Sequence, residues 1–187
     1  MRRTYLTAML TTVLSLAMAA PSLAALTLTS VAFSDGQTIP GKYAFNSFGC
    51  TGQNVSPPLS WSGAPAGTKS FVIVEYDPKA PTGVGWFHWI AFNIPATASG
   101  LPEGAGAVGA ANAPSGMQDG FTDFGAPGYG GMCPPTGDAP HPYTLTLYAI
   151  DVPQLPYADA TTTGAKTGYV LNGHVLAKAS LTGLFGR

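Results

Sequence analysis

Glycine and proline divide this chain into short apolar runs and leave little room for long helices. The 187 residues include 24 glycines and 17 prolines, which cluster with Asn and Asp between the runs. Such residues favour turns, because glycine tolerates positive φ and proline fixes φ near the value that a turn needs. The runs are rich in β-branched and aromatic residues, which pack well on a pleated sheet. Four runs stand out, at 26–33, 70–76, 87–94 and 143–150. The pattern predicts a turn-rich β-protein.

The run 143–150 alternates most clearly. Its threonines fall on one face and Tyr143, Leu145 and Leu147 on the other, as in a half-buried strand. A last strand is predicted around 179–185. The only helix candidate is 165–177, which follows threonines that can serve as N-caps.

The stretch 95–142 shows almost no strand or helix pattern. A loop of this length in a compact domain is usually functional or locally disordered. This one is dense in glycine and aromatic residues, so we expect an ordered loop that binds a ligand.

Residues 1–24 have the three-part layout of a secretory signal peptide. Arg2 and Arg3 precede an apolar run at 8–20, and Ser22-Leu23-Ala24 places small residues at the −3 and −1 positions of a cleavage site. Its serines, threonines and proline make it a poor transmembrane helix. We therefore predict a signal peptide, 1–24, and one mature domain, 25–187, that is periplasmic or secreted and has no transmembrane segment.

The charge of the mature chain excludes some partners. Without the two leader arginines the chain has six basic and nine acidic residues, a formal charge of −3. It therefore has no basic stripe for nucleic acid and no polybasic face for anionic lipid. The abundant aromatic residues also argue against a disordered chain.

The two cysteines are Cys50 and Cys133. A single pair in an oxidising compartment often forms a bridge, so the export signal predicts a Cys50–Cys133 disulfide. Two free thiols are the alternative that the sequence leaves open.

Several local motifs occur in a fixed order along the chain. They are D-P-x-A-P at 77–81, W-x-H-W at 86–89, G-Y-x-G-x-C-P-P-x-G at 128–137 and H-x-Y at 141–143. Together they resemble the phosphatidylethanolamine-binding protein family, in its bacterial branch often labelled Raf kinase inhibitor-like. The resemblance extends over nearly all of the mature chain, from Phe33 to the segment 173–177.

The resemblance implies an all-β fold, a two-sheet antiparallel β-sandwich with a small C-terminal helical element and an anion pocket at one end. It places eight residues at that pocket: Asp77, Pro81, Trp86, His88, Gly131, Pro134, His141 and Tyr143. The chain departs from the family pattern at Lys79, where relatives often have a second acid, and at Pro142, where they often have arginine.

The chemistry of these side chains is compatible with binding a small anion. Imidazoles and a phenol can donate hydrogen bonds to phosphate-like oxygens. His141 and Tyr143 lie two residues apart, so they share one face of a strand and should donate directly. We expect His88 to be a further donor oriented by Asp77, and anion binding to weaken as pH rises through the histidine pKa.

Two further expectations concern the surroundings of the anion. Backbone N–H groups of the glycine-rich segment 128–131 should approach the anion closely, as in nest-type sites. Trp86 and Tyr129 should line the pocket for an apolar part of the ligand.

Two other function classes compete with a binding protein. Asp77, His88 and His141 could form a two-histidine, one-carboxylate metal site of an enzyme, although their spacing matches no compact ligand motif. No G-x-S-x-G nucleophile elbow occurs, so we assign no catalytic residue, metal or cofactor. The second alternative is a protein-interaction module, such as a protease or kinase inhibitor. Metal analysis and a pull-down would discriminate between these classes. We predict a non-enzymatic protein that binds phosphate or a phospholipid headgroup, with the exact ligand, any protein partner and the oligomeric state left open.

Overall fold

The structure, a computed structural model, describes residues 25–187. The predicted signal peptide lies outside the described residues. In chain order the elements are β1 (Thr27–Thr29), a 3₁₀ helix (Gly41–Tyr43), β2 (Leu59–Ser62), β3 (Ser70–Asp77), β4 (Trp86–Pro95), β5 (Gly100–Leu101), β6 (Gln118–Asp119), β7 (His141–Ile150), α1 (Gly164–Val170) and β8 (Val175–Phe185).

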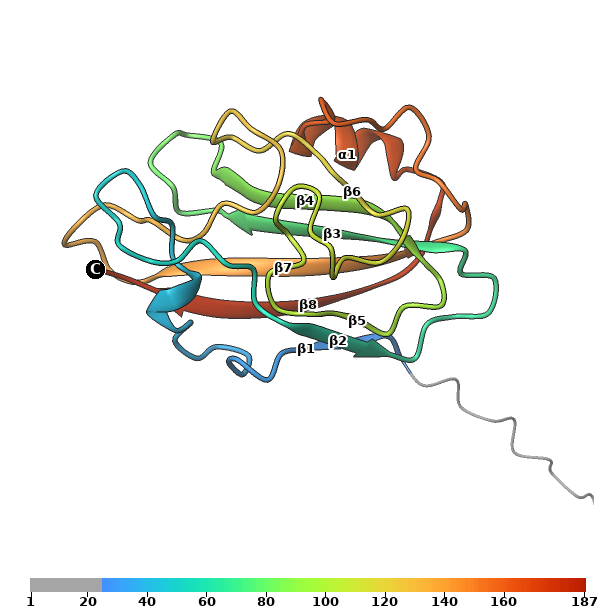
Figure 1. The fold of residues 1–187 in the computed structure, drawn as a ribbon, viewed down its shortest axis with the longest axis horizontal. Coiled ribbons are helices and arrows are strands. Elements are labelled where there is room, and N and C mark those ends of the chain that lie inside the picture. Colours follow the sequence, from blue (N-terminus) through green and yellow to red (C-terminus); the bar gives the residue numbers. More distant parts are fainter. Residues whose placement is uncertain (1–24) are drawn as a thin grey trace, which may run out of the picture.

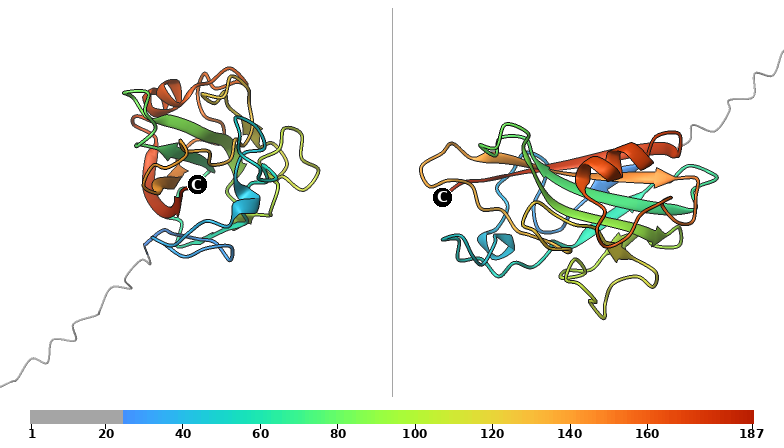
Figure 2. Two further views of the ribbon diagram at one scale, coloured as in Figure 1. Left: turned by 90° about the vertical axis from the view of Figure 1, so that its left-hand side faces the viewer. Right: turned by 90° about the horizontal axis from the view of Figure 1, so that it is seen from above.

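The strands form two antiparallel sheets. The larger has the order β6-β4-β3-β7-β8 and the smaller the order β1-β2-β5. Figures 1 and 2 show the smaller sheet packed against one face of the larger and α1 on the opposite side. The predicted two-sheet β-sandwich with a small C-terminal helical element is confirmed.

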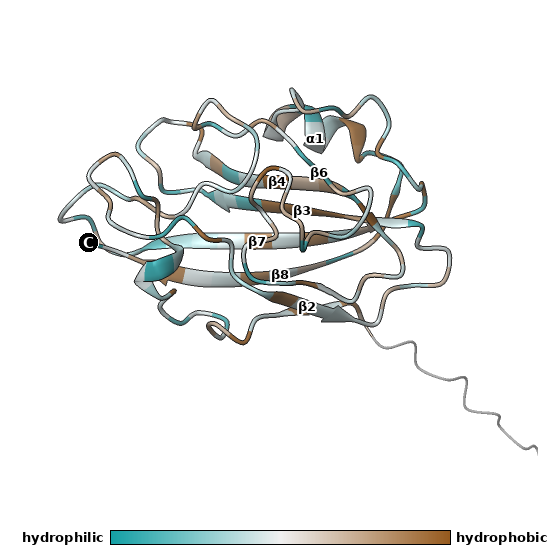
Figure 3. Ribbon diagram, viewed as in Figure 1, coloured by the Kyte–Doolittle hydropathy of each residue, from teal (hydrophilic) through white to brown (hydrophobic). Residues whose placement is uncertain are grey.

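Both faces of the larger sheet are covered, which explains the unbroken apolar run in β3. Phe71 and Ile73 point toward the smaller sheet and join the main core with Trp61, whereas Val72 and Val74 join a second core. That second core is closed by residues from α1 and the loop before it, such as Val170 and Leu155. The hydropathy colouring shows the resulting apolar band along β3 (Figure 3). A strand buried on both faces loses the polar/apolar alternation of a half-exposed strand.

The predicted helix 165–177 is too long. Thr163 caps the N-terminus of α1 by accepting a hydrogen bond from Lys166 N. The helix ends at Val170, because Gly173 has φ of +82° and turns the chain directly into β8. The residues from 175 onward extend β8, which pairs along the whole of β7.

The ends of several strands bring the sequence motifs together. Asp77 ends β3 opposite Trp86 at the start of β4, and His141 at the start of β7 pairs with Phe185 at the end of β8. All four positions therefore lie at one end of the larger sheet, where the C-terminus also lies (Figure 1). No helix within residues 25–187 has the length and apolar character needed to cross a membrane.

Candidate ligand-binding site

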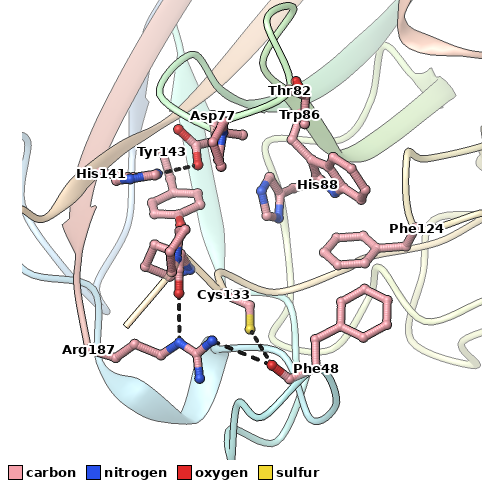
Figure 4. A pocket seen from close by; sticks show the side chains of 14 residues that line it. Phe48, Asp77, Thr82, Trp86, His88, Phe124, Cys133, His141, Tyr143 and Arg187 are labelled. Carbon is pink, nitrogen blue, oxygen red and sulfur yellow. Dashed lines mark hydrogen bonds and ion pairs between the residues drawn. The ribbon is translucent and has the colours of Figure 1, made fainter. Parts of the chain in front are cut away.

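A pocket of about 290 Å³ opens at this end of the sandwich, between the strand ends and three loops. Figure 4 shows its side chains converging from β3, β4, β7 and the loop segments around Phe48, Phe124 and Cys133. Its lining residues are Phe48, Asp77, Ala80, Pro81, Thr82, Trp86, His88, Phe124, Cys133, Pro134, Pro135, His141, Tyr143 and Arg187.

One wall contains a chain of three charged or titratable groups. His141 Nδ1 donates to Asp77 Oδ2 over 2.8 Å, and its Nε2 lies 3.3 Å from Asp138 Oδ2. The other oxygen of Asp77 accepts from the backbone N–H of Lys79 at 2.8 Å. Asp77 and His141 are buried, whereas Asp138 is half-exposed. Both nitrogens of His141 therefore face carboxylates.

His88 is fixed by the backbone instead. Its Nδ1 lies 2.8 Å from the carbonyl oxygen of Gly130. A carbonyl can only accept, so Nδ1 carries a proton and donates it. Burial lowers the pKa of His88 to about 4, and the smaller opposing effects of the Gly130 carbonyl and the Asp77 charge do not offset it. At neutral pH the ring is therefore uncharged, and its Nε2 is a hydrogen-bond acceptor.

Two buried donors at the pocket have no partner in hydrogen-bonding geometry, although Asp77 and the backbone of Cys133 lie near the Tyr143 hydroxyl. Within residues 25–187, the buried side-chain polar atoms that lack a hydrogen bond are Glu75 Oε2, Trp86 Nε1 and the hydroxyl oxygen of Tyr143. The last two belong to pocket residues. Burial, followed by the negative charge of Asp77, raises the pKa of Tyr143, so its hydroxyl stays protonated. Leaving such a donor unsatisfied costs about 1–3 kcal/mol.

Aromatic side chains close the opposite wall. Phe124 stacks on Phe45 with ring centroids 4.3 Å apart, and Phe48 lies 6.0 Å from Phe124. Trp86 and His88 each meet the Phe124 ring edge-on at 5.3 Å. Phe48 has a positive φ of 54° and is 66% exposed, so an apolar ring stands at the rim of the pocket.

A disulfide and side chain–backbone hydrogen bonds hold the loops around the pocket. The predicted Cys50–Cys133 disulfide is present, with a Cα–Cα distance of 5.9 Å. The Arg187 guanidinium donates to the carbonyl of Pro134 at 2.6 Å and to that of Gly49 at 2.8 Å. Asn54 accepts from Gly131 N and donates to the carbonyl of Tyr129.

The structure brings seven of the eight predicted site residues to this pocket: Asp77, Pro81, Trp86, His88, Pro134, His141 and Tyr143. Gly131 does not line it. The backbone N–H groups of Tyr129 and Gly130 donate to Gly106 O and His88 O, and that of Gly131 donates to Asn54. Internal acceptors therefore use the N–H groups of residues 129–131, which cannot at the same time donate to an anion as expected.

Four assigned roles also differ from the expectation. His88, expected as a further donor, presents Nε2 as an acceptor, and both nitrogens of His141, expected as a direct donor, face carboxylates. Asp77 bonds His141 rather than orienting His88, whose partner is the Gly130 carbonyl. Tyr129 does not line the pocket, since its ring is buried against Trp89 and its hydroxyl donates to the carbonyl of Tyr43. These misassignments arose because sequence order does not specify which neighbour a side chain meets across a sheet or between a strand and a loop.

Seven pocket residues were not assigned to the site from the sequence. Three of them, Ala80, Cys133 and Pro135, lie within the motifs, and the other four are Phe48, Thr82, Phe124 and Arg187. Each of these four lies outside the motifs, and no local pattern distinguishes it from other loop residues. Asp77, His88 and His141, the alternative metal ligands, are not assembled for that purpose. Among residues 25–187, no group of three His, Cys, Asp or Glu side chains is arranged to hold a metal ion.

The chain is similar to known proteins over most of its length. The family model described as phosphatidylethanolamine-binding protein matches residues 29–186. The UPF0098 protein YbcL of Escherichia coli is 42% identical over 179 residues, which cover 96% of this chain and 97% of YbcL. The UPF0098 protein YbhB of the same organism is 44% identical over 81% of this chain and 94% of its own length.

Solved structures show the same fold. The crystal structure of E. coli YbcL, described as a new member of the mammalian PEBP family, superposes with a TM-score of 0.84 at 43% identity, covering 88% of this chain and 99% of the other. The homologue CT736 of Chlamydia trachomatis superposes with a TM-score of 0.73 at 36% identity, covering 87% and 98%. This chain belongs to the phosphatidylethanolamine-binding protein family.

Proposed function

We propose that this protein is an exported binding protein for a small anion, phosphate or a phospholipid-headgroup-like group, held in the pocket between Tyr143 and Trp86. The observation that carries the proposal is the pair of buried donors without partners, the Tyr143 hydroxyl and Trp86 Nε1–H. Buried donors in folded proteins nearly always have an acceptor, so two orphans at one pocket indicate that a ligand supplies acceptor oxygens.

The size of the pocket supports a small ligand. A cavity of about 290 Å³ lies at the lower end of the range for small-molecule sites. It matches inorganic phosphate or phosphoethanolamine better than a whole lipid. The aromatic wall of Phe124 and Phe48 can contact the methylene groups of a substituent that extends toward the rim.

Tyr143→Phe tests the proposal. We expect the variant to bind phosphate and phosphoethanolamine about 10- to 100-fold more weakly than wild type in calorimetric titrations, because a hydrogen bond to a charged group contributes about 1.5–3 kcal/mol. Its stability in urea should equal or exceed that of wild type, because the substitution removes an unsatisfied buried hydroxyl.

Tyr148→Phe is the matched control, since Tyr148 lies on the same strand but packs against the second core. It should leave the affinity unchanged. Equal phosphate affinity in wild type and Tyr143→Phe would contradict the assignment of the donors. No binding of either compound to the wild type at millimolar concentration would contradict the proposed function itself.

A further inference from the structure

The free hydrogen-bonding groups of the pocket are not all donors. Tyr143 and Trp86 present donors without partners. His88 presents the opposite, because its Nδ1–H is bonded to the Gly130 carbonyl, which leaves Nε2 of the neutral ring as a hydrogen-bond acceptor. The Thr82 hydroxyl donates to the Gly85 carbonyl. The two oxygens of Asp77 accept from the Lys79 N–H and from His141. A complementary ligand therefore needs acceptor oxygens for two donors and one hydrogen to donate to an imidazole nitrogen.

The charges around His88 also favour a ligand that keeps a proton. Asp77 approaches from β3 and Asp123 from the loop after β6, and both are carboxylates. From β7 come His141, whose two nitrogens face Asp77 and Asp138, and the Tyr143 phenol, whose ring lies 5.1 Å from that of His88. The Arg187 guanidinium at the rim donates to backbone carbonyls. The groups around His88 are therefore carboxylates, a phenol and an imidazole that already faces two carboxylates, while three N–H groups of Arg187 are bonded to backbone carbonyls. A second negative charge on the ligand beside His88 would be repelled by Asp77 and Asp123.

We infer that the pocket selects an oxyanion that still carries a proton, such as a phosphate monoester monoanion, and that the ligand O–H donates to His88 Nε2. This inference rests on the proposed function and specifies its ligand. Two unprotonated oxygens of such a group accept from Tyr143 and Trp86, and its O–H satisfies the third free position. A phosphodiester has the same charge but lacks the O–H, so its ester oxygen would oppose the lone pair of Nε2. The low pKa of His88, about 4, agrees with an imidazole that accepts rather than donates.

Methyl phosphate and dimethyl phosphate form a matched pair of probes. Near pH 5 both are monoanions, since the second pKa of a phosphate monoester is about 6. We expect methyl phosphate to bind at least tenfold more tightly to the wild-type protein at pH 5, measured by calorimetric titration. His88→Phe, which keeps an aromatic ring against Phe124 and Tyr143, should remove most of this preference. His174→Phe, at a histidine that pairs with Asp151 far along the chain, should retain it.

Affinity as a function of pH does not by itself locate the proton, because a protonated ligand on neutral His88 and an ionised ligand on charged His88 hold the same number of protons. The ¹⁵N signal of His88 Nε2 does locate it. We expect this nitrogen to keep the chemical shift of an unprotonated imidazole nitrogen when methyl phosphate is bound. This measurement needs no variant, so it stands even where His88→Phe fails to fold.

The outcomes are separable. Equal or tighter binding of dimethyl phosphate, or a protonated Nε2 in the complex, would overturn the inference and leave anion binding intact. Failure of both probes and of inorganic phosphate to bind would overturn the proposed function and the inference with it.

Discussion

Glu75 lies in the middle of β3 on the face that contributes Phe71 and Ile73 to the main core. It is 1% exposed, and its Oε2 has no hydrogen-bond partner. Its neighbours across the sheet are Trp89 on β4 and Leu145 on β7, neither of which can carry a charge. Burial therefore raises the pKa of Glu75 from 4.5 to about 8. A carboxyl group in this environment is stable only in its neutral form.

The raised pKa makes the stability of the fold depend on pH. The unfolded chain loses the Glu75 proton near pH 4.5 and the folded chain near pH 8, so stability falls as pH rises between these values and is flat above them. At pH 7 the free energy of unfolding is therefore roughly 3 kcal/mol lower than it would be if the Glu75 pKa were unshifted. Glu75→Gln should therefore be more stable than wild type at pH 7 by up to this amount and lose its advantage toward pH 4.5, as followed by urea unfolding at several pH values.

The comparison has an internal control. Burial also raises the pKa of Asp119 to about 6, which gives a pH dependence of the same sign, but this effect is common to wild type and variant and cancels in their difference. Glu103→Gln alters an exposed carboxylate that pairs with Lys42 and accepts from the Tyr43 hydroxyl. Because the pKa of Glu103 is lowered, this variant should differ from wild type by an amount that stays constant from pH 4.5 to pH 8. A difference between wild type and Glu75→Gln that stays constant from pH 4.5 to pH 8 would show that Glu75 is not titrating in this range.

At the scale of the elements, the strands supply the polar groups of the pocket and the loops supply its walls. β3, β4 and β7 carry Asp77, His88 and Tyr143, while the segment before β2 carries Phe48 and the one before β7 carries Cys133. The Cys50–Cys133 disulfide joins these two loop segments across 83 residues of sequence. The Arg187 side chain bonds to both of them as well.

The disulfide should therefore affect both stability and the pocket. We expect the double variant Cys50→Ser/Cys133→Ser to lose about 2–5 kcal/mol of unfolding free energy, the usual range for a native bridge. Its phosphate affinity should also fall, because Phe48 and the Cys133 segment lose their covalent link. Urea unfolding and phosphate titration, with and without a dithiol reductant, measure both effects. The reductant should lower the stability and phosphate affinity of wild type toward those of the double variant and should not affect the double variant. If the bridge is shown to be reduced and the wild-type unfolding and titration curves do not change, the disulfide does not have this role.

For the whole molecule, the sequence predicted the elements that depend on long local patterns and missed those that depend on partners. The runs that became β3, β4 and β7 are long and β-rich, so their positions were correct within one or two residues. The strands β5 and β6 have two residues each and exist only through pairing with β2 and β4. The sequence motifs also predicted residues that line one pocket. The pairing of Asp77 with His141 was missed, because it depends on how β3 and β7 align, which no local pattern encodes.

We expect the signal peptide predicted at residues 1–24 to be removed during export. Leu26 and Leu28 are buried in the main core, so cleavage after Ala24 would leave β1 and its contacts intact, while a cut several residues later would remove core side chains. We expect the full chain, expressed in a Gram-negative bacterium, to yield a protein that starts at Ala25 in the osmotic-shock fraction, as measured by intact mass. Ala24→Leu, which places a bulky residue at the −1 position, should block cleavage, whereas Ala17→Leu within the apolar run should not. Intact Met1 on wild-type protein in a membrane fraction would contradict a cleaved signal peptide.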